Sequence, residues 1–115
     1  MNSPSRPAAS VFAEGVRAPP IGAEVSVVMV VFRTGPALAE ALGRVLACPE
    51  VEELVVVDNG SSASEMAAMD EAAARDGRMQ VLRGQGNVGF ARAANLGASS
   101  LEAAISDQVV TYDLA

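Results

Sequence analysis

The feature that most constrains this chain is the alternation of strand-like apolar runs with helix-like segments. β-branched runs occupy residues 25–32 and 54–57, and shorter runs occupy residues 79–83 and 109–112. Strands that alternate with helices form a parallel sheet with right-handed crossovers. The sequence therefore predicts an α/β fold, a Rossmann-like parallel sheet with the element order βαβαβαβ.

The segments between these runs carry helix signals. The first, at about residues 36–48, has Pro in its opening turn and an apolar stripe at helical spacing. The second, at about residues 62–77, opens with Ser62 and Glu65 in the pattern of a capping box. The third is expected from about residue 90 to residue 105.

The N-terminal 24 residues differ from the rest of the chain. They are rich in Ser, Pro, Ala and Gly, a composition that buries too little apolar surface to offset the cost of ordering. We therefore expect a flexible arm at residues 1–24 and a packed domain at residues 25–115. No apolar run approaches the roughly 20 residues of a membrane span, and the N-terminus has no signal-peptide core. The expected location is cytoplasmic, with peripheral attachment to a membrane left open.

Two composition features exclude whole classes of function. The chain has no His, and all eight basic residues are Arg. A Ser-His-Asp relay, a P-loop lysine and a His-based zinc site are therefore excluded within it. The net charge is −6 and no basic cluster occurs, which argues against nucleic acid as a partner.

The chemically distinctive residues follow the predicted strands. In open parallel sheets, ligands bind beyond the carboxyl ends of the strands. Those ends carry Phe32-Arg33, Asp58-Asn59-Gly60, the loop 84–89 and Asp113. This distribution predicts a ligand site at one edge of the sheet.

Asp58 is the single residue that most specifically suggests a function, and it has two interpretations. A carboxylate at a strand end can accept the imide N–H of a uracil or thymine ring, and Gly60 would let backbone approach the ligand closely. Asp, Asn, Gly and Ser are equally suited to a turn that leads into a helix cap. From these residues alone, both interpretations stay open.

The loop GQGNVGFA at residues 84–91 also has two interpretations. It contains G-x-G-x-x-G and precedes a helix, which is typical of NAD-binding oxidoreductase domains. Against that interpretation, Arg83 directly precedes the loop, and two βα units come before it. The dinucleotide fingerprint normally lies in the first βα turn.

Three segments taken together resemble family 2 glycosyltransferases. They are VSVVMVVFR, VVVDNGSS and NVGFARAANLG, in this order and spacing. In the last segment the matching residues are Asn87, Gly89, Phe90, Ala91, Ala94, Asn95 and Gly97. The resemblance covers about residues 25–113 and implies the nucleotide-binding half of a GT-A fold. It further implies transfer of a sugar from a nucleotide-diphosphate donor to an acceptor. A glycan and a lipid-linked molecule are both compatible acceptors. The DNGSS sequence is more similar to rhamnosyltransferase-type members.

The resemblance also implies site residues. Val31 and Phe32 would cradle the base, and Arg33, which follows them, is also expected to belong to the nucleotide site. Asp58, followed by Asn59 and Gly60, would accept a hydrogen bond from the imide N–H of the base. The diphosphate and sugar side would involve Asn87, Gly89 and Asn95. Asp113 would take the first acidic position of a D-x-D or N-x-D element that binds a divalent metal, Mn or Mg. No catalytic residue is implied within the chain.

Departures from the family pattern shape the remaining expectations. Arg33 stands where the family usually has Asn, and its side chain would either reach phosphate or be solvated. Ala115 stands at the second acidic position, so the expected metal site is incomplete, because one carboxylate supplies few of the oxygens that these ions need. We therefore expect a fragment with doubtful activity on its own, or a non-catalytic truncated nucleotide-binding module.

Overall fold

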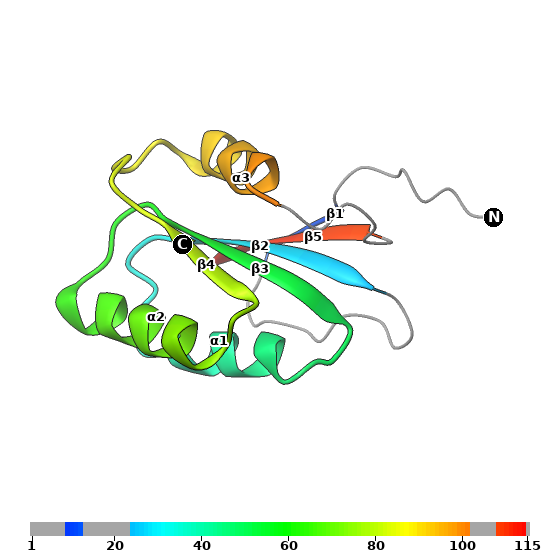
Figure 1. Ribbon diagram of the computed structural model, residues 1–115. Coiled ribbons are helices and arrows are strands. Elements are labelled where there is room, and N and C mark those ends of the chain that lie inside the picture. Colours follow the sequence, from blue (N-terminus) through cyan, green and yellow to red (C-terminus); the bar gives the residue numbers. More distant parts are fainter. Residues whose placement is uncertain (1–8, 13–23, 102–107, 115) are drawn as a thin grey trace.

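The computed structural model describes residues 9–12, 24–101 and 108–114 (Figure 1). The elements, in chain order, are β1 (Ala9–Phe12), β2 (Val25–Val31), α1 (Ala37–Leu46), β3 (Val51–Asp58), α2 (Ala63–Arg75), β4 (Met79–Leu82), α3 (Phe90–Ser99) and β5 (Gln108–Leu114).

The described strands form one parallel sheet in the order β1-β5-β2-β3-β4. The four strands predicted from the sequence are β2, β3, β4 and β5, so the predicted α/β fold and element order are confirmed. β2 lies in the middle, and all seven of its residues are buried. Burial on both faces explains why this segment is a continuous β-branched run without polar alternation.

The helices form a layer on each face of the sheet (Figure 1). α1 and α2 cover one face, where Leu38, Leu42 and Met69 pack against Met29 and Leu54. α3 covers the other face, where Ala93 packs against alternate residues of the two central strands, Val28, Val30, Val55 and Val57. The pleat of a strand sends successive side chains to opposite faces, so each central strand contributes to both cores.

Gly97 lets α3 approach the sheet closely. A Cβ atom at this position would lie 2.4 Å from Cγ1 of Val28 and 3.1 Å from Cγ2 of Val57. Neither distance leaves room for a methyl group. The glycine of the NVGFARAANLG segment therefore has a packing role at the interface between α3 and the two central strands.

Four residues of the N-terminal arm form a strand that the sequence did not predict. The sequence interpretation assigned no strand there, but Ala9–Phe12 pairs in parallel with residues 110–113 of β5. The edge of β5 that faces away from β2 offers unpaired backbone N–H and C=O groups, which a short extended segment can satisfy. The remainder of the predicted arm, residues 1–8 and 13–23, lies outside the described residues.

α3 is also shorter than predicted, because it ends at Ser99 and not near residue 105. The N–H of Ser100 bonds to the carbonyl of Gly97 (3.1 Å), and its hydroxyl bonds to the carbonyl of Leu96 (3.0 Å). Side-chain hydrogen bonds of this kind compete with continued helix. Residues 102–107 lie outside the described part of the chain.

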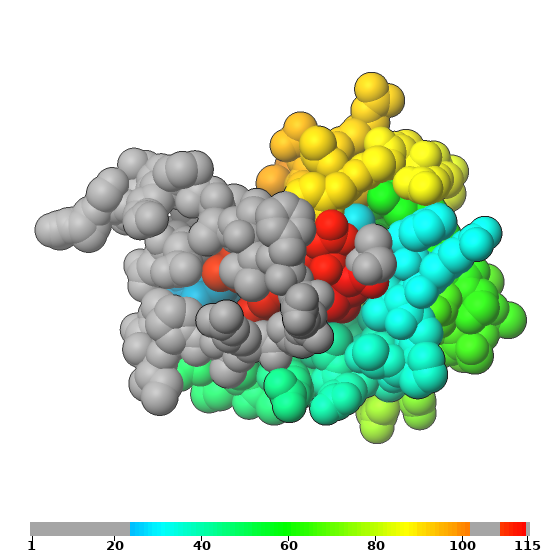
Figure 2. Space-filling model, turned by 180° about the vertical axis from the view of Figure 1, so that it is seen from behind, coloured from blue at the N-terminus to red at the C-terminus, as the bar shows by residue number. Residues whose placement is uncertain are grey.

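The end of β5 lies against the segment that follows β2. The carbonyl of Leu114 accepts a hydrogen bond from Oγ1 of Thr34 at 2.6 Å. In Figure 2 the red end of β5 adjoins the cyan segment that follows β2. The carboxyl ends of β2 and β5 are thereby held together at one edge of the sheet.

Candidate functional site

The topology marks one edge of the sheet as the place for a ligand. From β2 the chain moves outward through β3 to β4, and then α3 returns it to β5 on the other side of β2. Ligands in such sheets bind at the carboxyl ends of the strands where the order reverses. The predicted residues Phe32, Asp58 and Asp113 lie at the ends of β2, β3 and β5.

A hollow of about 480 Å³ opens at the ends of β2 and β3. The turn after β2 contributes Phe32 and Arg33, and the turn after β3 and the start of α2 contribute Gly60, Ser61, Ser62 and Glu65. Phe32, Arg33 and Gly60 were predicted as site residues. Ser61, Ser62 and Glu65 were not, although the capping box in the sequence had already placed two of them at the start of α2.

Two backbone hydrogen bonds join the turns that form this hollow. The N–H of Arg33 bonds to the carbonyl of Gly60, and the N–H of Asn59 bonds to the carbonyl of Val31, each at 2.8 Å. Gly60 has φ of 149°, and a Cβ atom there would lie 3.0 Å from Cδ1 of Phe32. A glycine is therefore needed for the ring of Phe32 to lie against the turn.

Arg33 has an unusual backbone and a defined side-chain position. Its φ of 50° makes it the one non-glycine residue with positive φ in the described chain. Its guanidinium lies over the ring of Phe32, 5.3 Å from the centroid. Within the described residues it forms no ion pair within 4.0 Å.

Asp58 is 6% exposed and is not among the residues that line the hollow, although its side chain bonds to two of them. Its Oδ1 accepts hydrogen bonds from the N–H of Gly60 (2.9 Å) and the hydroxyl of Ser61 (2.7 Å). Its Oδ2 lies 3.6 Å from Nε of Arg83, which also bonds to Asp70 of α2 at 2.9 Å. Oδ1 thus stabilises the turn after β3, as expected if Asp58 is a turn residue, and Oδ2 is directed toward Arg83.

Glu65 ties the start of α2 to the turn after β2. One carboxylate oxygen accepts from the N–H of Ser62 at 2.6 Å, and the other accepts from the N–H of Gly35. Ser62 in turn caps the N–H of Glu65, so the predicted capping box is confirmed. The N–H of Ser62, followed by that of Gly35, holds the pKa of Glu65 below its ordinary value.

The loop at residues 84–89 is fastened to the end of β3. Nε2 of Gln85 donates to the carbonyl of Asp58 at 2.8 Å, and Nδ2 of Asn59 donates to the carbonyl of Gly89 at 3.4 Å. Asn87 accepts from the N–H of Gly89 at 3.0 Å. The structure therefore brings Asn87 and Gly89 next to the predicted residues of β3, and Gln85 joins them without having been predicted.

Some predicted residues lie apart from the hollow. The side chain of Val31 is fully buried in the core, and Asn95 is exposed on α3, outside the lining of the hollow. Asp113 pairs with Val30 of β2, whereas Asp58 pairs with Val31. Because pleat alternation sends Val30 and Val31 to opposite faces, the two aspartates start from opposite faces of the sheet.

No complete metal site is formed by the part of the chain that the structure describes. No three residues among its Cys, Asp and Glu side chains gather closely enough to hold an ion. Asp113 thus remains a single candidate ligand.

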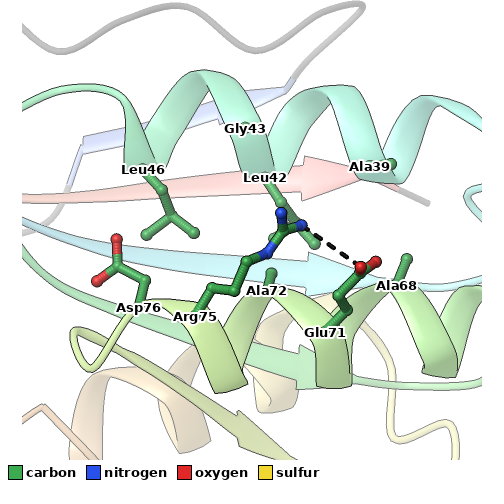
Figure 3. Close-up of a pocket in the computed structure, with 9 residues that line it drawn as sticks. All are labelled: Ala39, Leu42, Gly43, Leu46, Ala68, Glu71, Ala72, Arg75 and Asp76. Carbon is green, nitrogen blue, oxygen red and sulfur yellow. Dashed lines mark ion pairs between the residues drawn. The ribbon is translucent and has the colours of Figure 1, made fainter.

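A second groove, of about 340 Å³, lies between α1 and α2 (Figure 3). Four of its nine lining residues are small, namely Ala39, Gly43, Ala68 and Ala72, and two others, Arg75 and Glu71, pair at 3.8 Å. The groove extends toward the C-terminal ends of both helices, away from the strand ends that carry the predicted residues.

Comparison with known proteins gives one family match. The model of the family described as Glycosyl transferase family 2 matches residues 26–113, which include all of β3 and all but the first residue of β2. No curated protein matches the chain. Among the described residues, no helix has both the length and the apolar character that crossing a membrane requires.

Proposed function

We propose, because this chain belongs to glycosyl transferase family 2, that it binds the nucleotide of a nucleotide-diphosphate sugar in the hollow at the ends of β2 and β3. The sugar would then be transferred to an acceptor, a glycan or a lipid-linked molecule. The observation that carries this proposal is the hollow itself, which has Phe32 in its lining and a carboxylate, Asp58, bonded to two further lining residues, Gly60 and Ser61. Its volume of about 480 Å³ lies within the usual range of small-molecule sites.

The chemistry of Asp58 favours a pyrimidine base with an imide N–H. An ionised carboxylate has about four lone-pair positions, and two of them are used by the turn. Oδ2 can accept a further hydrogen bond, and the N3–H of uracil or thymine supplies it. The similarity of Asp58-Asn59-Gly60-Ser61-Ser62 to rhamnosyltransferase-type members leads us to place a nucleotide-diphosphate rhamnose first among the donors.

Asn87, Gly89 and Asn95 are proposed for the diphosphate and sugar side of the donor. Support for the first two comes from their loop, which is fastened to the end of β3 through Asn59 and Gln85. The same loop was also considered as an NAD fingerprint. It follows β4, the edge strand of the sheet, and lies within the family match, so we favour the glycosyltransferase interpretation of its glycines.

Family 2 glycosyltransferases typically use a divalent metal, and the expected Mn or Mg ligand here is Asp113. The described residues do not fit such an ion by themselves. Asp58, the nearest strand-end carboxylate along the sheet, starts from the opposite face and is committed to the turn and Arg83. Mg²⁺ prefers six oxygen ligands, so Asp113 would be one contributor to a site completed by other groups.

A ligand panel tests the proposed function. Isothermal titration or protein NMR would compare UDP and dTDP with CDP, ADP and NAD. We expect UDP or dTDP to bind most tightly and to shift the signals of Phe32 and Gly60. Preferential binding of NAD or of a purine nucleotide would overturn the proposal.

A further inference from the structure

We propose that Arg33 binds the diphosphate of the donor, and that its guanidinium leaves the ring of Phe32 to do so. This inference rests on the proposed function and adds to it the residue that supplies the positive charge. A nucleotide-diphosphate sugar carries negative charge on both phosphates, so its site needs a cationic group or an equivalent set of donors.

The charges around the hollow single out Arg33. Among the six residues that line it, Arg33 is the only cation and Glu65 the only anion. Both carboxylate oxygens of Glu65 accept hydrogen bonds from backbone N–H groups. The capping box of Ser62 and Glu65 also uses N–H groups at the N-terminus of α2 that could otherwise bind an anion. Of the neighbouring cations, Arg83 is engaged with Asp58 and Asp70. Arg33 acts on Glu65 electrostatically but forms no ion pair within 4.0 Å, so among the described residues it is the lining cation that can turn to an anion.

The backbone holds Arg33 in place although its conformation is unfavourable. A φ of 50° is disfavoured for a residue with a Cβ atom, and such residues persist where the surrounding structure determines them. Here the N–H of Arg33 bonds to Gly60, and Gly35, two residues later, takes φ of 80°. The side chain thus starts from a fixed point at the rim of the hollow.

The contact with Phe32 can be exchanged for a stronger one. A guanidinium stacked on a half-buried aromatic ring, as on Phe32, gains a modest cation–π attraction, whereas a guanidinium and a phosphate form paired, charge-assisted hydrogen bonds. Departure of the guanidinium also uncovers the ring of Phe32, whose position is set by Gly60. A flat pyrimidine can then stack on that ring, so one side-chain movement serves both the phosphates and the base.

The test compares ligands with and without phosphate on the full 115-residue chain. Titration calorimetry would measure UDP and uridine against wild type, Arg33→Gln and Arg33→Lys. The matched control is Arg44→Gln, which removes one exposed positive charge from the last turn of α1, outside the hollow. Circular dichroism would check that every variant is folded.

We expect Arg33→Gln to weaken UDP binding by about 10- to 100-fold, the usual value of hydrogen bonds to charged groups, and to change uridine binding by less than about twofold. Arg33→Lys should recover part of the loss, and Arg44→Gln should change neither ligand. Equal loss for UDP and uridine, or no loss for UDP, would overturn the role of Arg33 and leave the proposed function standing. Failure of wild type to bind either ligand would overturn both.

Discussion

The carboxylate of Glu65 accepts a hydrogen bond from the backbone N–H of Gly35, thirty residues earlier in the chain. The same carboxylate closes the capping box with Ser62 at the start of α2. One side chain therefore both begins a helix and fastens it to the turn after β2. This contact, together with the bond between Arg33 and Gly60, gives the hollow its shape.

Glu65→Ala removes both the capping box with Ser62 and the hydrogen bond to the N–H of Gly35. We expect the midpoint of thermal unfolding to fall by about 5 °C, which is a typical shift for the loss of one such feature in a small domain. Glu71→Ala, an exposed change on the same helix, should shift the midpoint by little. Equal shifts in the two variants, measured by circular dichroism, would show that the tie to Gly35 contributes nothing.

The pH dependence of the Glu65 contribution has a defined sign. Because the pKa of Glu65 is lower in the folded protein than in the unfolded chain, its stabilisation is present above the ordinary glutamate pKa. It is lost as pH falls through the lowered value. The difference in unfolding free energy between wild type and Glu65→Gln should therefore be constant near neutral pH and should narrow in acid. Denaturant melts at several pH values measure it.

Arg78 and Asp76 form a second junction, away from the hollow. Arg78 donates to the carbonyls of Leu46, Cys48 and Val51, and it pairs with Asp76 at 2.7 Å. The hydrogen bonds from Arg78 lower the pKa of Asp76 to about 2. We expect Asp76→Asn to cost about 1–2 kcal/mol at neutral pH.

This stabilisation should persist well below neutral pH. The folded pKa of Asp76 is depressed, so its contribution is complete above the unfolded value of 3.8 and is lost only as pH falls through about 2. NMR titration of the Asp76 carboxyl checks the value directly. A titration midpoint near 3.8 in the folded protein would contradict the assignment.

Two glycines in helices provide a matched pair of substitutions. Gly97→Ala places a methyl group 2.4 Å from Val28, and forcing extra volume into a packed interface typically costs about 1–3 kcal/mol. Gly43→Ala, at an exposed position of α1 that lines the groove between α1 and α2, meets nothing within 4 Å and should stabilise by about 0.5–1 kcal/mol. Urea melts of both variants should therefore move in opposite directions. Parallel shifts would mean that α3 does not pack on Val28 as described.

Asp58→Asn should change which base is bound. The remaining oxygen can still accept from Gly60 and Ser61, and the new amide N–H₂ then takes the place of Oδ2. A donor facing the N3–H of uracil is unfavourable, whereas the N3 of cytosine is an acceptor. We expect UDP to bind at least about 10-fold more weakly and CDP to bind more tightly. Unchanged preference in competitive titrations would remove Asp58 from base recognition.

Several features of this protein follow from the sequence alone. The apolar runs, the capping box and the breaks at Gly and Pro are local patterns, and each is set by contacts within a few residues. They were enough to predict the α/β fold and the place of Phe32, Asp58 and Asp113 at the strand ends. They could not predict the short strand at residues 9–12, because its formation depends on a free edge of β5 far along the chain.

The shape of the candidate site was decided only by the tertiary structure. The register of β2 with β3 and β5 separates Asp58 and Asp113 onto opposite faces, and a shift of one residue would reverse that relationship. Likewise, nothing near Glu65 in the sequence indicates that its second oxygen binds Gly35. Hydrogen bonds between distant segments depend on how the whole sheet and its helices pack, and a local pattern carries no information about that packing.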